Sequence, residues 1–205
     1  EEIADRRLAR QGLTRPELAV LLAYAKITMY ESLLDSHVPG ALEFTLMLAE
    51  YFPKPICKRF ADQMYEHYLK YEIIATHVTN TIVNRMGITF AFRLGEETGA
   101  TAAEVAFAWA IACEVFRARH FWQQLEALDN QVPAQIQMQM QTEFRKLIER
   151  ATRWMLRNSR ALADHGEVAK KFAAGIEQLL PILPHILHGS ERSNSQRRAD
   201  EYREA

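Results

Sequence analysis

The sequence contains little cysteine, and its two cysteines stand far apart among apolar neighbours, at Cys57 and Cys113. No C-x-x-C pair exists, so the chain lacks the usual motif of a zinc site or a dithiol redox site. Free cysteines are most often buried in a protein core, and a cytoplasmic, reducing compartment fits this usage best. We therefore expect two buried free thiols and no disulfide framework.

An excess of charge of one sign and long apolar runs are also missing. The 205 residues include 25 Lys and Arg against 26 Asp and Glu, which gives a net charge of −1. A nucleic-acid-binding protein usually has a basic excess, so nucleic acid is not expected as the main partner. No run of about 18 apolar residues occurs, so no membrane partner is expected. The first residues are charged and lack the apolar centre of a signal peptide.

Motifs of cofactor and metal chemistry are absent as well. The sequence has no G-x-G-x-x-G, no P-loop, no H-E-x-x-H and no Glu-x-x-His. His185 and His188 stand three residues apart, but two imidazoles without a third ligand are better explained as an exposed helix end. Glu96 and Glu97 are adjacent and would point apart on a helix, as solvated carboxylates do. We therefore expect no catalytic, cofactor-binding or metal-binding residue in this chain.

What the sequence does contain is apolar periodicity at helical spacing. The stretch "YEIIATHVTNTIVNRMG" has aliphatic residues at every fourth position, whereas a strand would alternate at every second. The pattern predicts an all-α fold, a multi-helix bundle in a single domain with no sheet. This domain is expected to cover residues 1–188, with 189–205 as a polar tail. The periodic aliphatic residues are Ile74, Val78, Ile82 and Met86.

Capping motifs and helix breakers predict where individual helices begin and end. Thr14 with Glu17, and Thr101 with Glu104, form capping boxes at two helix starts. Prolines and glycines separate the periodic segments. Helices are expected within residues 13–36, 41–51, 53–87, 101–129, 132–159 and 164–189, with a short helix and a turn over 88–100.

Hydrogen-bonding side chains follow a second face of the helix expected to end at Gly87. Asn and Thr are poor helix formers, and a merely solvated face would carry Lys and Glu, so their use indicates tertiary hydrogen bonds. These bonds could join neighbouring helices of this domain, or bind a partner or another domain of the same polypeptide. A catalytic role is not expected, because no nucleophile or strong acid–base pair accompanies them. The members, called the polar row below, are His77, Asn80, Thr81, Asn84 and Arg85.

Three stretches resemble the C-terminal region of the large bacterial NAD-specific glutamate dehydrogenases. They are "LTRPELAVLLAYAKI", "YFP" and "EIIATHVTNTIVNRMGITFAFRLGEETGA", and the similarity covers roughly residues 8–187. The resemblance implies that the full-length protein is a cytoplasmic, homo-oligomeric enzyme of amino-acid catabolism. Such an enzyme converts L-glutamate, water and NAD to 2-oxoglutarate, ammonia and NADH. The resemblance also implies that the catalytic and NAD-binding domains lie upstream, so no catalytic residue is carried over to this chain.

These observations predict a non-catalytic C-terminal helical domain that has no cofactor of its own and supports assembly or regulation of the enzyme. Its partner would be the catalytic part of the same polypeptide or a neighbouring subunit. Two alternatives stay open from the residues alone: a stand-alone helical adaptor or scaffold, and a domain that senses a small molecule. The bundle pattern allows the adaptor, and only the resemblance argues against it.

Overall fold

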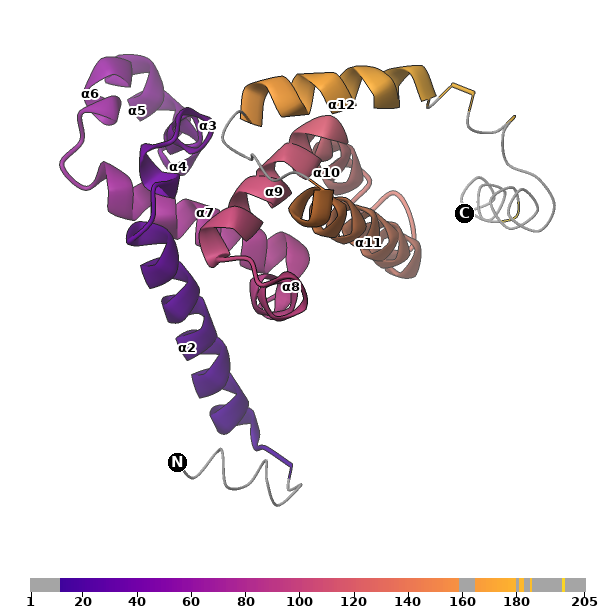
Figure 1. Cartoon of the computed structure of the whole chain (residues 1–205), viewed down its shortest axis with the longest axis horizontal. Coiled ribbons are helices and arrows are strands. Elements are labelled where there is room, and N and C mark those ends of the chain that lie inside the picture. The colour runs from indigo at the N-terminus through magenta and orange to yellow at the C-terminus, as the bar shows by residue number, and fades with distance from the viewer. Residues whose placement is uncertain (1–11, 159–164, 180, 183–184, 186–196, 198–205) are drawn as a thin grey trace. The chain divides into compact units, whose positions relative to one another are not determined.

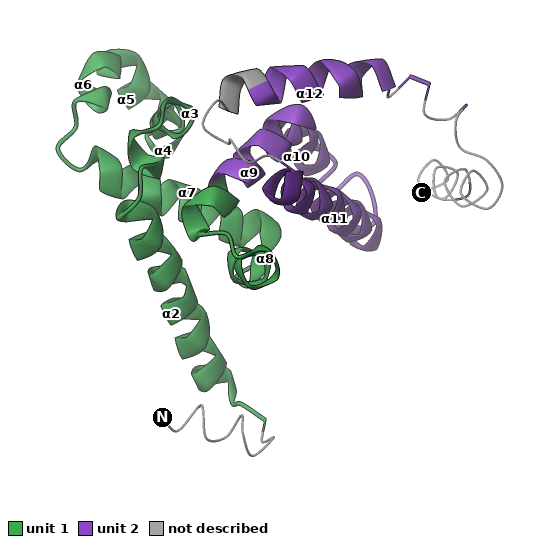
Figure 2. Cartoon of the chain, in the orientation of Figure 1, with its two compact units in different colours: residues 1–106 green, residues 107–205 purple. Residues whose placement is uncertain are grey.

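A computed structural model describes residues 12–158, 165–179, 181–182, 185 and 197. Within these ranges every regular element is a helix and none is a strand, which confirms the all-α prediction (Figure 1). The chain divides into two compact units, residues 1–106 and 107–205, which are described separately below (Figure 2). The expected polar tail, apart from Arg197, lies outside the described residues, so its boundary stays a prediction.

Helix α7 (Lys70–Met86) is the central element of unit 1, where it packs against α2 (Arg15–Leu34). Its periodic aliphatic residues are all buried, with relative exposures between 0 and 3%. Complete burial of one such side chain stabilises a fold by about 1.5–3 kcal/mol. In α2 the buried residues are Met29 and Leu33, both in its C-terminal half. The contact between these two helices therefore forms the core of unit 1.

Both predicted capping boxes are present. The Glu17 carboxylate accepts hydrogen bonds from the backbone N–H and from Oγ1 of Thr14, each at 2.7 Å. At the second site Glu104 accepts the backbone N–H of Thr101 at 2.7 Å, and Thr101 Oγ1 accepts the N–H of Glu104 at 3.3 Å. A helix start leaves four N–H groups without partners inside the helix, and a capping side chain contributes about 1 kcal/mol by pairing one of them.

Several short helices connect α2 to α7. The single helix predicted over 41–51 is divided into two, and the one predicted over 53–87 is divided into three, so both predictions are wrong in part. The break at Phe60 has φ −129° and ψ 32°, outside the helical region. The connecting elements are η1 (Val38–Gly40), α3 (Leu42–Thr45), α4 (Leu48–Tyr51), α5 (Lys54–Arg59) and α6 (Ala61–Tyr65).

The break between α6 and α7 has a local cause in hydrogen bonding. The His67 ring accepts the backbone N–H of Leu69 at 3.1 Å. The carbonyl of Tyr65 accepts a hydrogen bond from Lys70 Nζ at 3.2 Å. In a continuous helix the Leu69 N–H would instead bond the Tyr65 carbonyl. Side chains therefore take both partners of that helical bond, and the helix restarts one turn later.

The short helix and turn predicted over 88–100 are confirmed by α8 (Phe90–Thr98). Gly99 ends this helix with φ 73°, and its N–H donates to the carbonyl of Gly95 at 2.8 Å. A left-handed residue at this position is nearly always glycine, because a Cβ atom would clash with the backbone. The glycine therefore sets where α8 stops and the next capping box begins.

Unit 2 begins inside α9, and its described residues include three further helices. The single helix predicted over 101–129 is wrong, because Arg117 has left-handed backbone angles, φ 49° and ψ 42°. That conformation costs a non-glycine residue roughly 1–2 kcal/mol. Packing after the break helps to offset this cost, since Phe121 stacks on Phe144 with ring centroids 3.9 Å apart. The helices are α9 (Ala102–Val115), α10 (Ala118–Ala127), α11 (Ala134–Asn158) and α12 (His165–Leu179).

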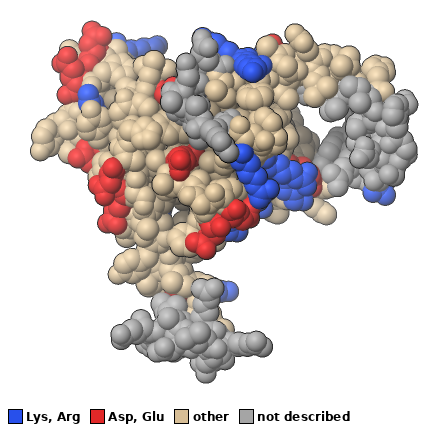
Figure 3. Space-filling view, in the orientation of Figure 1, with Lys and Arg blue, Asp and Glu red and all other residues tan. Residues whose placement is uncertain are grey.

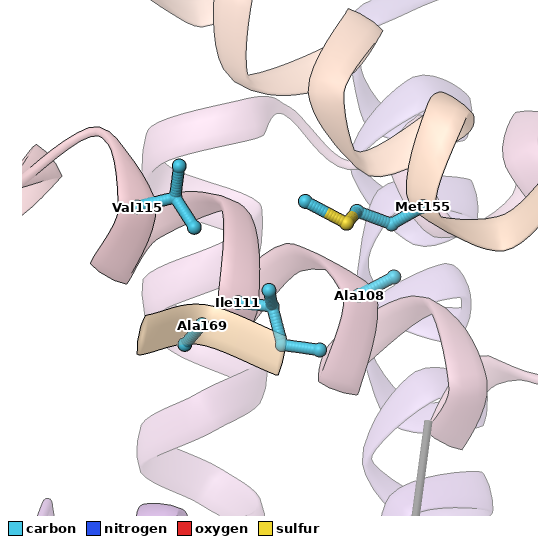
Figure 4. Close-up of a cluster of buried hydrophobic side chains, with 5 residues drawn as sticks. All are labelled: Ala108, Ile111, Val115, Met155 and Ala169. Carbon is cyan, nitrogen blue, oxygen red and sulfur yellow. The ribbon is translucent and has the colours of Figure 1, made fainter. Parts of the chain in front are cut away.

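A buried cluster joins α9, α11 and α12 within unit 2 (Figure 4). Beside it, Trp154 of α11 packs edge-on against Phe172 of α12, with ring centroids 5.4 Å apart. The apolar helix that begins at Thr101 therefore lies in the interior of a bundle, as its composition predicts. The buried residues of the cluster are Ala108, Ile111, Val115, Met155 and Ala169.

Thr79 and Thr152 provide a matched test of polar burial. Thr79 is 1% exposed and Thr152 is 0% exposed. Thr152 Oγ1 donates to the carbonyl of Ile148 at 2.8 Å, whereas Thr79 Oγ1 has no hydrogen-bond partner among the described residues. An unsatisfied buried hydroxyl costs about 1–3 kcal/mol, so Thr79→Val should raise the free energy of unfolding by about 1 kcal/mol.

The control variant Thr152→Val should leave the free energy of unfolding unchanged or lower it, because its hydroxyl is already satisfied. Urea titration followed by circular dichroism measures both variants against the unmodified chain. Destabilisation by Thr79→Val would contradict this description of the core.

Candidate functional site

The polar row follows α7 beside its buried aliphatic residues. Asn84 is exposed, and the other four members are half-buried. The helical repeat brings positions three and four residues apart onto one face, so α7 holds these side chains in line. The row is therefore partly accessible, and its most accessible member is near the C-terminal end of α7.

Within the row, His77 contacts a second helix. Its Nε2 lies 3.7 Å from Oε2 of Glu50 on α4, and the two side chains are 21% and 39% exposed. Thr81 Oγ1 donates to the backbone carbonyl of His77 at 2.8 Å, a bond within α7 that helical threonines commonly make. The structure thus adds Glu50 to the predicted set. No spacing rule in the sequence links Glu50 to the row, because it reaches His77 only through the fold.

The side chains of the row suit hydrogen bonding better than proton transfer. Asn80 and Asn84 carry amides that donate and accept, and Arg85 carries a planar fork of donors. None of them is a nucleophile held against a general base. In the part of the chain that the structure describes, no three His, Cys, Asp or Glu side chains could together hold a metal ion. The arrangement can therefore bind a polar surface through hydrogen bonds.

The other side chains singled out in the sequence are His185, His188, Glu96 and Glu97. His185 is exposed, whereas His188 lies outside the described residues, so their pairing is not tested. Glu96 and Glu97 are both exposed in α8, in keeping with solvated carboxylates.

A second surface, on α2, was not predicted. Residues 18–27, toward the N-terminal end of this helix, carry large apolar side chains that are 40–65% exposed. The signal in the sequence is the uncharged run "LAVLLAYA", but a buried bundle helix has the same composition. None of the helices in the described ranges combines the length and hydropathy needed to cross a bilayer. The exposed side chains, called the α2 apolar surface below, are Leu18, Val20, Leu21, Leu22, Tyr24 and Ile27.

Both cysteines are free, as predicted, but each is half-buried and not fully enclosed. Cys57 Sγ lies 3.1 Å from the carbonyl oxygen of Ala49 and 3.3 Å from that of Phe52, where the thiol can donate a weak hydrogen bond. Burial raises the pKa of the Cys113 thiol well above its usual value, and the positive charge of Arg119 opposes this shift only in part. The raised pKa favours the protonated thiol, which is the less reactive form.

Comparison with known proteins places the chain in a family. Residues 10–205 match the family described as "Glutamate dehydrogenase, C-terminal". Because this match covers nearly the whole sequence, the chain belongs to that family, which confirms the resemblance noted in its residues.

Three relatives are each named NAD-specific glutamate dehydrogenase. The protein of Pseudomonas aeruginosa is 44% identical over 205 residues, which make up all of this chain and 13% of that protein. The protein of Halomonas elongata is 38% identical over 201 residues, 98% of this chain and 12% of that protein. The protein of Mycobacterium tuberculosis is 32% identical over 202 residues, with the same two shares. The chain thus spans about an eighth of the relatives it matches.

The two cysteines should differ in reactivity. At pH 8, iodoacetamide should modify Cys57 at least about tenfold faster than Cys113, because a raised thiol pKa lowers the fraction of reactive thiolate. The variants Cys57→Ser and Cys113→Ser, followed by mass spectrometry, assign the two rates. In urea the two rates should become similar. Faster modification of Cys113 in the folded chain would contradict its assigned environment.

Proposed function

We propose that this chain is the non-catalytic C-terminal helical domain of an NAD-specific glutamate dehydrogenase, and that it supports assembly or regulation of the catalytic part. The full-length protein would convert L-glutamate, NAD and water to 2-oxoglutarate, ammonia and NADH, in the cytoplasm and as a homo-oligomer. NAD and glutamate would bind outside this chain. The family match and the names of the relatives support this proposal over a stand-alone adaptor.

The polar row is the observation that carries the proposed supporting role. One face of α7 is fully buried in unit 1, and the adjacent polar row stays partly accessible. Asn and Thr reduce helix stability by up to about 0.7 kcal/mol each relative to Ala, so the three of them in the polar row need a compensating role. Hydrogen bonds to the catalytic part of the same polypeptide, or to a neighbouring subunit, provide one.

The contact between His77 and Glu50 partly orders the polar row before a partner binds. It joins α7 to α4, so the imidazole has fewer orientations available before a partner binds. A side chain that is already ordered loses less conformational entropy on association. Exposed Asn84 presents an amide that can both donate to and accept from a partner. The row therefore combines a fixed end at His77 with an accessible end at Asn84.

The variant Asn84→Leu tests the row directly. Leucine is a better helix former than asparagine, so the helicity of the isolated chain should not fall. A partner group left without its hydrogen bond costs about 1–3 kcal/mol, which is a weakening of binding by at least about fivefold. Isothermal titration of the chain against the separately produced remainder of its polypeptide measures this loss.

The matched control is Asn158→Leu, at an exposed helical asparagine outside the row. It should bind the remainder with the affinity of the unmodified chain. Equal affinity of both variants, or unfolding of Asn84→Leu on its own, would show that the row is not the contact.

A further inference from the structure

The α2 apolar surface differs sharply from the other half of the same helix. Met29 and Leu33 in the C-terminal half are 8% and 0% exposed, whereas Leu22 and Tyr24 are 48% and 65% exposed. In Figure 1 the N-terminal half of α2 extends beyond the other helices of unit 1. Over most of this stretch the side facing the viewer is uncharged (Figure 3). Contiguous exposed apolar surface of this kind marks an interaction site in a folded protein.

The apolar side chains surround the helix and do not form a single stripe. At 100° per residue, Leu18 and Leu22 share one side, while Val20 and Ile27 lie on nearly the opposite side. Lys26 is the single charged residue within 18–27. A helix that is apolar on nearly all sides is typical of the interior of a large protein. One partner helix could cover only a part of this surface.

The distribution of apolar side chains around α2 indicates which kind of partner could cover them. Pairing with α2 of a second copy would bury one seam, as in a two-stranded coiled coil, and leave the other sides exposed. A groove in a larger body can enclose several sides at once. The relatives supply such a body, because the matched region is only 12–13% of their length. The remainder of the same polypeptide is therefore the occupant that fits best.

We infer that residues 18–27 of α2 insert into an apolar groove in the remainder of the polypeptide, an inference that rests on the function proposed above. The capping box at Thr14 and Glu17 forms the start of the helix without a partner's help. The binding segment is thus already helical, which lowers the entropy lost on docking. Lys26 is expected at the rim of the groove, because its ammonium group stays in water.

Cysteine labelling tests this inference in the full-length protein. Leu22→Cys should react with a maleimide at least about tenfold more slowly in the full-length polypeptide than in the 205-residue chain alone. Ser32→Cys, at an exposed position in the other half of α2, should lose much less reactivity. Peptide mapping by mass spectrometry separates these sites from Cys57 and Cys113. Equal reactivity of Leu22→Cys in both proteins would overturn the inference.

Protection of Leu22→Cys in the 205-residue chain alone, increasing with its concentration, would also overturn it and identify a second copy as the occupant. If the remainder binds the chain while Leu22→Cys stays reactive, the α2 docking site is wrong and the proposed function stands. If the remainder does not bind the unmodified chain at all, the proposed function itself fails.

A charge at the same position gives an independent readout. Leu22→Glu would place a carboxylate in the groove without a partner, so the remainder should bind this variant at least about tenfold more weakly. Leu42→Glu is the matched control, since Leu42 is 70% exposed and lies outside α2. Both variants should keep the helicity of the unmodified chain, because the replaced leucines are exposed and glutamate is a good helix former. Equal weakening by both would contradict a specific role for α2.

Discussion

The burial of the aliphatic face of α7 is the constraint on which the rest of unit 1 depends. Ile74, Val78 and Ile82 are fully buried, and α2 packs against this helix through its C-terminal half. Because α7 is fixed along its buried face, the adjacent polar row is held in register. The same packing holds only one end of α2, so its N-terminal half extends without cover from its own unit. Both candidate contact surfaces therefore follow from one hydrophobic contact.

The two surfaces have complementary physical roles. An apolar surface that surrounds a helix supplies binding free energy in proportion to the area removed from water, but it gives little orientation. A row of amide, hydroxyl and guanidinium groups gives direction, because each hydrogen bond requires a particular geometry. Together they would let a small helical domain attach to a much larger polypeptide in one orientation. Such an attachment requires no catalytic residue on either surface.

Features that depend on interactions within a few residues could be predicted from the sequence. The helical period of the α7 aliphatic residues and the capping box at Thr101 could be predicted, because helical geometry and capping hydrogen bonds act within a few residues. The helix break at Arg117 could not be predicted, since a left-handed arginine depends on packing such as that of Phe121. The exposure of Leu22 could not be predicted from the sequence for a related reason. A run of apolar residues has the same composition whether its partner is this domain or another body.

The most direct test of this account is the rate of glutamate-dependent NADH production by the remainder of the polypeptide, with and without the 205-residue chain. Complex formation should be recorded in the same samples by size-exclusion chromatography. We expect the two parts to form a complex and the rate to be restored or altered in proportion to the complex formed. An unchanged rate with no complex would contradict it, and would leave this helical domain with a task outside the dehydrogenase.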